Sequence, residues 1–342
     1  MMRWSTRLAF LAATFVLLAG SGFAGRGAMA QAPLPITIGY LDATNWLMFA
    51  ARELKLFENA GLASTFVKFN APEPMTAAVQ DKRIDVAPLG TIPFLVGLSQ
   101  GIGWTMIGIY NEGPYIEGFV ARKDGGIDTL ADLKGRRIGY FRGSTSHYGV
   151  IMALRQQGIR LDQVTLVHLP PAEQLAALAN KEIDAAAVWE PWMQRMVHEA
   201  NGRIIATEGD LGIYSNVGGF AVRRDWLREN RETAVRFVRG LLMAYDAVQK
   251  DPNVAIRALA KESGVRESWA KTMYQNAPPP RIYLWTDQGY SYSLVEGSGL
   301  HRRLGYLATF LFDEQIIAEK VDVSEAFDAS VITEALKTWK RQ

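Results

Sequence analysis

The sequence predicts an α/β fold made of two lobes joined by a two-strand hinge, and three observations lead to this prediction. Short β-rich runs alternate with segments of helical periodicity, which is the pattern of parallel sheets covered by helices. One βα unit occurs twice, as "QDKRIDVAPLGTIPF" (80–94) and "ANKEIDAAAVWEPWM" (179–193). An extended segment also occurs twice, as "EGFVARKD" (117–124) and "GGFAVRRD" (218–225). Chance likeness between short βα units is the alternative explanation of the first repeat.

The first predicted lobe uses both ends of the mature chain, residues 31–124 and 218–342. Helical periodicity at 45–61, which stops at Gly61, and in "PMTAAVQDKR" predicts helices between its strands. β-branched and apolar runs predict the strands themselves at 36–41, 64–69, 84–90 and 103–110.

The second predicted lobe, residues 125–217, is inserted into the first. A helix is expected from His147 to Gly158, because "HYGVIMALRQQG" is periodic and ends in glycine. β-branched and apolar runs again predict the strands, at 135–141, 164–169, 183–189 and 203–209.

The repeated extended segments are expected to cross between the lobes as a pair, which would make a hinge that permits closure around a ligand. Beyond them the chain should be mostly helical and should pack on the first lobe. We expect helices at 233–249 and 324–339 and an extended surface loop at 277–285.

The first 30 residues have the features of a secretory signal peptide rather than of the fold. A basic start with Arg3 and Arg7 precedes the apolar run "LAFLAATFVLLAG" (8–20), and "AMA" precedes Gln31. The run is shorter than the roughly 20 residues that a membrane span needs, so a short anchoring helix is the weaker alternative. We therefore expect export, with cleavage near Ala30.

Composition narrows the function classes. The chain of 342 residues has 37 basic and 35 acidic residues, a balance that argues against a nucleic-acid binder. It contains no cysteine, which excludes disulfides, thiolate metal sites and cysteine nucleophiles. No calcium loop, histidine pair of helical spacing or Walker-type phosphate loop occurs, so the sequence predicts neither a metal nor another cofactor.

The segment "FRGSTSHYG" (141–149) is the main candidate for binding. It joins a predicted strand to a predicted helix, so its hydroxyl side chains occupy the N-cap region of that helix. Helix starts present free amides and a partial positive charge, which suit an anion. The candidate residues are Ser144, Thr145, Ser146 and His147. A plain helix cap with no ligand is the alternative.

A catalytic interpretation of the same segment has less support. The nucleophile turn of serine hydrolases has the pattern G-x-S-x-G, whereas here Thr145 and His147 stand at the central and last positions. Neighbouring residues on a helix, such as Ser146 and His147, also point in different directions.

Other loops that follow strands should face the same cleft. "TIPF" begins with Thr91 as a cap, and Trp189 with Glu190 follows a strand of the second lobe. Asn45 and Trp46 open the first helix. The tryptophans could contact the organic part of a ligand. The alternative is that their side chains only pack in the protein interior.

These segments resemble the solute-binding proteins of taurine, alkanesulfonate and nitrate-type ABC importers. The matching segments are "LKGRRIGYFRGSTSHYGVIMALRQQGI", "KEIDAAAVWEPW", "RIDVAPLGTIP" and "FAVRRDW", and the likeness runs from about 36 to 340. The resemblance implies a type II periplasmic binding protein fold, a small organic anion held between the lobes, and a membrane permease with its cytoplasmic ATPase as partner. It also implies a periplasmic monomer without a cofactor that serves sulfur metabolism.

The resemblance places the hydroxyl-rich helix start on the sulfonate side of the ligand and Thr91 opposite it. Taurine binders hold the amine with acidic groups, and Glu117 stands at one such position. Gly218 and Asn45 stand where two further acids are expected, and Glu190 and Asp42 are the available substitutes. These departures leave sulfonates, sulfate esters and related organic anions open as ligands.

Three alternatives remain beside sulfonate import. The first is a binding protein for a nitrate-like anion or a thiamine-precursor pyrimidine. The second is an enzyme on the same fold, such as a pyrimidine-precursor synthase, which uses a cysteine-rich segment that this chain lacks. The third is a sensory module that feeds a separate receptor.

Overall fold

The structure is a computed structural model that describes residues 32–213 and 217–340. The predicted signal peptide at 1–30 lies outside the described residues. Within the described ranges no helix is both long and apolar enough to cross a membrane.

The first sheet has five strands, and they overlap the four strands and the extended segment at 218–225 that the sequence predicted for the first lobe. In spatial order they are β2 (Leu62–Lys68), β1 (Leu34–Tyr40), β3 (Val86–Gly90), β10 (Gly218–Arg223) and β4 (Trp104–Asn111). β1 is parallel to β2 and β3, whereas β10 runs antiparallel to both β3 and β4. The carboxyl ends of β1 and β3 therefore lie at the same end of the sheet.

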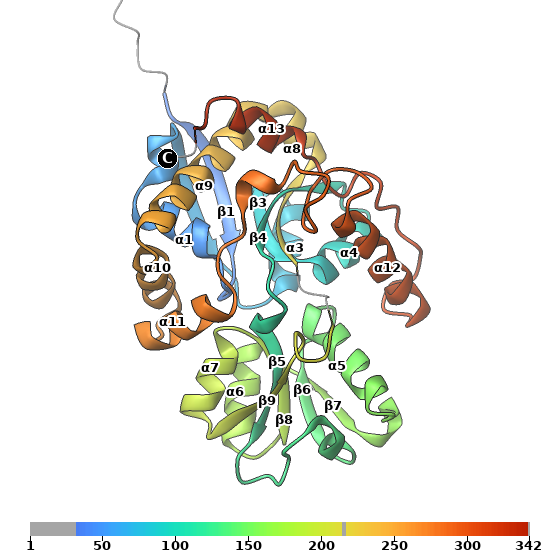
Figure 1. Cartoon of the computed structure of the whole chain (residues 1–342). Helices are drawn as coiled ribbons and strands as arrows, with labels where there is room; N and C mark the ends of the chain where they lie inside the picture. Colours follow the sequence, from blue (N-terminus) through green and yellow to red (C-terminus); the bar gives the residue numbers. More distant parts are fainter. Residues whose placement is uncertain (1–31, 214–216, 341–342) are drawn as a thin grey trace, which may run out of the picture. The chain divides into compact units, whose positions relative to one another are not determined.

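Helices cover both faces of this sheet (Figure 1). One group packs near β1 and β2: α1 (Trp46–Glu53), α2 (Leu56–Asn59), α9 (Arg231–Lys250) and α10 (Asn253–Ser263). The helices α3 (Pro72–Gln80), α4 (Thr91–Ser99) and α12 (Gly299–Asp313) form a second group. The remaining helices here are α8 (Arg224–Glu229), α11 (Glu267–Asn276) and α13 (Ser330–Leu336).

Three expectations for this part of the chain need correction. The helix predicted at 45–61 is broken, because Lys55 has a left-handed φ of 54° between α1 and α2. The segment 277–285 is not a surface loop, since the side chains of Ile282 and Trp285 are fully buried. The helix predicted at 324–339 is limited to α13.

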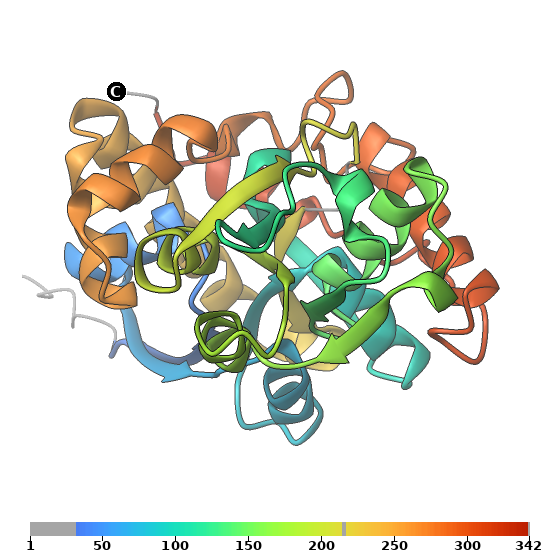
Figure 2. The same ribbon diagram turned by 90° about the horizontal axis from the view of Figure 1, so that it is seen from below.

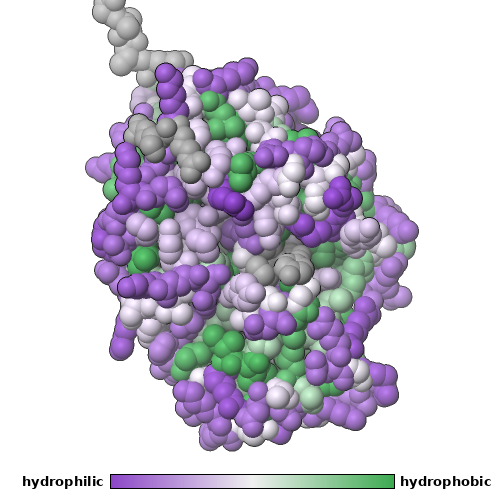
Figure 3. All heavy atoms as spheres, viewed as in Figure 1, coloured by the Kyte–Doolittle hydropathy of each residue, from purple (hydrophilic) through white to green (hydrophobic). Residues whose placement is uncertain are grey.

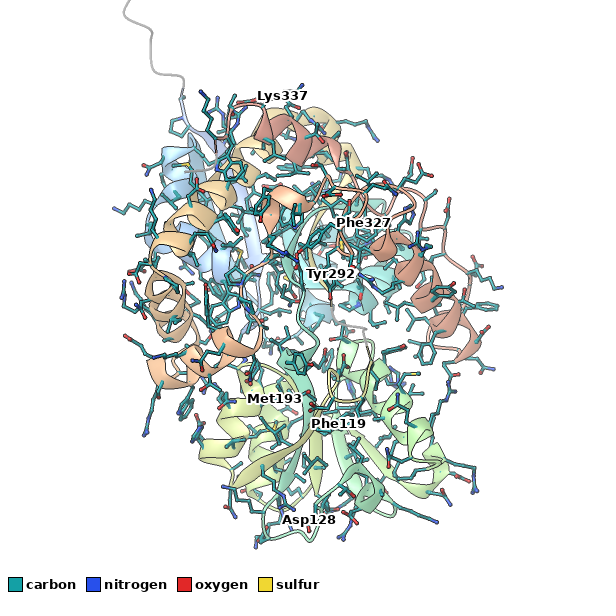
Figure 4. The ribbon with its side chains drawn as sticks, in the orientation of Figure 1. Phe119, Asp128, Met193, Tyr292, Phe327 and Lys337 are labelled. Carbon is teal, nitrogen blue, oxygen red and sulfur yellow. The ribbon has the colours of Figure 1, made fainter. Side chains whose placement is uncertain are left out.

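The second sheet repeats the arrangement of the first. Its spatial order is β7 (Thr165–His168), β6 (Arg137–Tyr140), β8 (Ala185–Trp189), β5 (Glu117–Arg122) and β9 (Gly202–Thr207). Figure 2 shows α5 (Thr145–Gln156) on one side of it and α6 (Pro171–Ala179) with α7 (Trp192–Glu199) on the other. Phe119 of β5 belongs to the hydrophobic cluster under α5, and Met193 to the cluster on the opposite face (Figure 4).

The repeated βα unit forms the same local structure in both sheets. The carboxylate of Asp85, just before β3, accepts a hydrogen bond from the backbone N–H of Thr37 at 2.8 Å. The carboxylate of Asp184, just before β8, accepts one from the backbone N–H of Arg137 at 2.9 Å. In each case the acceptor aspartate ties its strand to the neighbouring parallel strand. The repeat is therefore structural, and chance likeness does not explain it.

The expected two-strand hinge is wrong in its pairing. β5 pairs with β8 and β9 in the second sheet, and β10 pairs with β3 and β4 in the first, so the two repeated segments do not pair with each other. Each is instead the antiparallel strand of its own sheet. The pairing thus assigns 117–122 to the second sheet, although the sequence placed 117–124 with the first lobe. The chain passes between sheets in the connections after β4 and after β9.

The surface in Figure 3 is mostly polar, with apolar side chains gathered over the lower part of this face, where the second sheet lies. Ile204, on the edge strand β9, is 36% exposed. The core lies in three hydrophobic clusters, one of which contains residues of both sheets.

Candidate functional site

A small cavity lies where loops from both sheets meet, and we call it the central cavity. Its volume is about 30 Å³. The lining residues are Leu41, Ala43, Thr44, Pro72, Gly90, Pro93, Tyr110, Asn111, Ile116, Ser144, Thr145, Trp189 and Glu190. Most of these residues lie at or just after the ends of β1, β3, β4, β6 and β8, so the cavity is at the strand-end position expected for a ligand in α/β folds.

Two larger cavities flank the central one. The histidine cavity, of about 590 Å³, shares Pro72 and Pro93 with it and contains His147, His168 and Arg142. The tryptophan cavity, of about 540 Å³, shares Leu41 and Trp189 with the central cavity and also contains Trp192. A ligand whose charged group occupies the central cavity would thus have adjoining space for an organic tail on either side.

The start of α5 brings hydroxyl groups to the central cavity, as the sequence predicted. Ser144 is the N-cap residue, and its Oγ donates to the carbonyl of Phe141 at 2.7 Å. The hydroxyls of Ser144 and Ser146 lie 2.8 Å apart, within hydrogen-bond distance. Because the first turn of a helix has unpaired amides and a partial positive charge, this wall favours an anion.

The two sheets approach each other closely at this wall. A Cβ atom at Gly90, the last residue of β3, would lie 2.8 Å from Cγ2 of Thr145. A side chain at position 90 would therefore require Thr145, at the start of α5, to shift. On the other side, the indole N–H of Trp189 donates to the carbonyl of Asp42 at 3.1 Å and joins β8 to the loop after β1.

Glu117 is a buried acid beside the cavity and begins β5. Glu117 is 1% exposed. One of its carboxyl oxygens accepts a hydrogen bond from the hydroxyl of Thr145 at 2.8 Å. The other oxygen has no hydrogen-bond partner among the described residues. Burial raises the pKa of Glu117 to about 8, although the bond from Thr145 acts in the opposite direction. The carboxyl group is thus largely neutral at pH 7.

Glu190 is a second buried acid, and it lines the cavity directly. Its two oxygens accept hydrogen bonds from the side-chain amide and the backbone N–H of Gln194, at 3.2 and 3.1 Å. Burial raises its pKa to about 7, while the two bonds from Gln194 lower it. Both oxygens of Glu190 are therefore occupied within α7, in contrast to Glu117.

His147 faces the histidine cavity rather than the central one. Its Nδ1 accepts a hydrogen bond from the backbone N–H of Gly143 at 3.3 Å. Burial is the largest cause that lowers the pKa of His147, to about 4, and the charge of Arg142 acts in the same direction. The imidazole is therefore neutral at pH 7 and offers no positive charge to an anion.

The structure does not bring all the predicted residues to the cavity wall. Trp46 is fully buried in the first lobe, where its indole N–H donates to the carbonyl of Ala277 at 2.8 Å and its ring packs edge-on against Tyr274. Four further predicted residues are buried next to lining residues without lining the central cavity themselves: Asn45, Thr91, Glu117 and Ser146.

Sequence reasoning missed Tyr110, which lines the cavity from the end of β4. A Cβ atom at Gly218 would lie 2.0 Å from Cζ of Tyr110, so the tyrosine ring occupies the space in front of that glycine. The pairing of β10 with β4 creates this contact, and Gly218 pairs with Asn111, the neighbour of Tyr110. A glycine in a strand often marks such a close approach, and that signal was available.

Further contacts join the two sheets on either side of the cavities. Arg155 of α5 forms an ion pair with Glu314, which follows α12. On the opposite side, the ring of His198 on α7 stacks on Trp269 of α11, with ring centroids 4.3 Å apart. Within the described ranges, no group of three or more metal-ligating side chains was found.

Comparisons with known proteins show the family of this chain. The model of the NMT1-like family matches residues 30–262. A Bacillus subtilis protein named for aliphatic sulfonate binding is 24% identical over 333 residues, which cover 96% of each chain. The taurine-binding periplasmic protein of Escherichia coli is 26% identical over 240 residues, which cover 68% of this chain and 74% of that one.

Solved structures share the fold. The alkanesulfonate-binding protein SsuA from Xanthomonas axonopodis pv. citri, bound to MOPS, has a TM-score of 0.73 at 24% identity and covers 89% of this chain and 98% of its own. The desulfurization enzyme DSZB has a TM-score of 0.68 at 17% identity and covers 89% of this chain and 99% of its own. The two-lobed α/β fold is therefore found both in a binding protein and in an enzyme.

Proposed function

Because this chain belongs to the NMT1-like family, we propose that it is the periplasmic solute-binding component of an ABC importer for a sulfonate-type organic anion. The relatives named for aliphatic sulfonate and taurine binding support this proposal. The observation that carries it is the start of α5, where Ser144 and Thr145 line a cavity between the two sheets. A sulfonate has three oxygen acceptors that suit hydroxyls and helix amides.

The mechanism is capture without covalent chemistry. The anion meets the hydroxyls and amides at the start of α5, and the helix dipole stabilises its charge. The organic part extends into a flanking cavity, and Trp189 contacts it. The lobes, which we place on either side of the connections after β4 and β9, close over the solute and present it to the permease with its ATPase.

Export to the periplasm through a signal peptide cleaved near Ala30, and a monomeric state, belong to the same proposal. The periplasmic taurine-binding relative supports the location. Taurine, alkanesulfonates and sulfate esters are the candidate solutes.

An enzymatic role is the second candidate, since DSZB shares the fold. The hydroxyl of Ser144 donates to the carbonyl of Phe141, and Nδ1 of His147 accepts from Gly143, so neither is arranged as a nucleophile with its base. The chain also lacks cysteine. We therefore propose binding and transport rather than catalysis.

Thermal unfolding with added solutes tests the proposal. We expect propane-1-sulfonate to raise the melting temperature in a phosphate buffer, because a ligand at 100 times its Kd stabilises by about 2.7 kcal/mol. Butyrate and glucose serve as carboxylate and neutral controls. Stabilisation by glucose but by no sulfonate would overturn the proposal, and turnover of the sulfonate would favour the enzyme.

A further inference from the structure

Glu117 has one carboxyl oxygen that is buried without a partner, next to the cavity where the anion is proposed to bind. Its other oxygen is fixed by the hydroxyl of Thr145, and both Thr145 and Ile116 line the cavity. An unsatisfied buried oxygen is costly, so a partner for it is expected in the functional state. The bound solute is the natural candidate.

The groups around Glu117 do not compensate a negative charge. Tyr110 faces it from β4, Glu190 follows β8, and the backbone N–H of Glu208, after β9, donates to the carbonyl of Glu117. His147, on α5, is neutral at pH 7. Among residues 32–213 and 217–340, no salt bridge to Glu117 was found within 4.0 Å.

An anion at the start of α5 makes the ionised form of Glu117 still less favourable. Two negative charges in one buried site repel strongly, and such sites bind a proton instead. A protonated carboxyl can donate its hydrogen to an oxygen of the anion, which also satisfies the unpartnered oxygen. The proton comes from solvent, and no covalent bond to the ligand forms or breaks.

We infer that Glu117 is a specificity-determining residue that binds the solute as a neutral hydrogen-bond donor, so that this site selects amine-free organic sulfonates. The inference rests on the proposed function. Capture of such a sulfonate takes up one proton whenever Glu117 is ionised beforehand. A solute with an ammonium group near its sulfonate would instead favour the ionised form of Glu117, so its binding at pH 7 would release a proton rather than take one up.

The neighbourhood of Gly218 supports this choice of ligand. The ring of Tyr110 leaves no room for an acidic side chain at that position. Both oxygens of Glu190 already accept hydrogen bonds from Gln194, whereas one oxygen of Glu117 has no partner among the described residues. The site therefore offers one acid with an unpartnered oxygen beside the helix start and a second acid whose oxygens are already bonded.

Isothermal titration calorimetry tests the inference with propane-1-sulfonate and taurine, which differ by a methyl group in place of the ammonium. Titrations in phosphate and in Tris buffers, which differ in ionisation enthalpy, give the number of protons taken up. For propane-1-sulfonate we expect about a tenth of a proton at pH 7 and close to one at pH 9, because burial raises the pKa of free Glu117 to about 8. Its Kd should weaken roughly tenfold for each pH unit above this pKa.

The variant Glu117→Gln supplies the second measurement. The amide is a permanent neutral donor, so we expect the Kd for propane-1-sulfonate at pH 7 to stay within about threefold and its pH dependence to flatten. Glu112→Gln is the matched control: Glu112 is also buried with a pKa raised to about 7, but it lies in the connection after β4 and bonds to Tyr290. This control should keep the pH dependence of the wild type.

Tighter binding of taurine, with loss of that preference in Glu117→Gln, would overturn the inference and leave sulfonate binding intact. So would a Kd for propane-1-sulfonate that is independent of pH up to pH 9.5. If neither sulfonate binds at any pH, the proposed function itself fails. The wild-type proton count decides the inference even if the variant does not fold.

Discussion

The ring of Tyr110 occupies the space in front of Gly218, so that a Cβ atom at position 218 would lie 2.0 Å from Cζ of the tyrosine. In the sequence, Gly218 was only a departure from the acid expected in taurine-binding proteins. The contact with Tyr110 explains the glycine by packing. An acid at position 218 is incompatible with the tyrosine that lines the cavity.

Gly218→Ala should therefore destabilise the protein. Overpacking of a buried site costs about 1–3 kcal/mol, and the added methyl also displaces a cavity wall. Urea denaturation measures this change. Gly103→Ala is the matched control, because its Cβ atom would meet only Arg224, at 3.6 Å, and should change the free energy of unfolding by less than about 0.5 kcal/mol. Tyr110→Ala should relieve the clash. If Gly218→Ala destabilises the Tyr110→Ala variant as much as it destabilises the wild type, the explanation is refuted.

Replacement of both Ser144 and Ser146 by alanine should weaken sulfonate binding about tenfold or more. The change removes the hydroxyl of Ser144 at the cavity wall and that of Ser146, which lies 2.8 Å from it. The side chain of Ser144 makes no cap hydrogen bond, so the variant should keep the start of α5. Calorimetric titration with propane-1-sulfonate measures the affinity. Ser298→Ala removes the side-chain cap of α12. Because Ser298 does not line the central cavity, the change should lower stability without altering Kd. Unchanged affinity in the double variant would exclude this wall as the anion site.

His147 should make folding stability depend on pH between its unfolded and folded pKa values. Since burial lowers its pKa from 6.5 to about 4, the unfolded chain binds the proton first, and stability is lost as the pH falls from 6.5 towards 4. The full effect is about 3 kcal/mol. His147→Gln should remove this component, as measured by the difference between the unfolding free energies of variant and wild type at pH 7 and pH 4.5. A difference that is the same at both pH values would contradict the assignment.

Trp46→Phe should lower stability but leave sulfonate affinity unchanged. The substitution leaves the carbonyl of Ala277 without its donor, which costs about 1–3 kcal/mol for a buried group. Trp189→Phe loses a comparable bond to Asp42 but also alters the cavity wall, so its Kd should change. Equal changes of affinity in the two variants would place Trp46 in the binding site after all.

Local patterns in the sequence determined much of the fold. The repeated βα unit could be identified because Asp85 and Asp184 hold the same position before a buried strand, where each bonds to the neighbouring strand. The hydroxyls at the start of α5 could be predicted for the same reason, since a cap is defined by residues adjacent in sequence.

Contacts between distant segments could not be predicted in this way. The strands at 117–122 and 218–223 were expected from their composition, but their partners depend on which sheet each enters, and alternation does not encode this. Trp46 was expected at the cavity because it begins a helix after a strand. Its partner Ala277 comes from a segment that had been predicted to lie on the surface.

The central cavity has consequences for how a ligand can be found experimentally. At about 30 Å³ it has room for about two water molecules, so an organic solute must arrive before the lobes meet. Crystals of this closed form would exclude a solute added by soaking, whereas growth in its presence would capture it. A solute acquired in the host cell would also survive dialysis. Protein that shows no binding should therefore be unfolded, washed and refolded, and the released wash analysed by mass spectrometry.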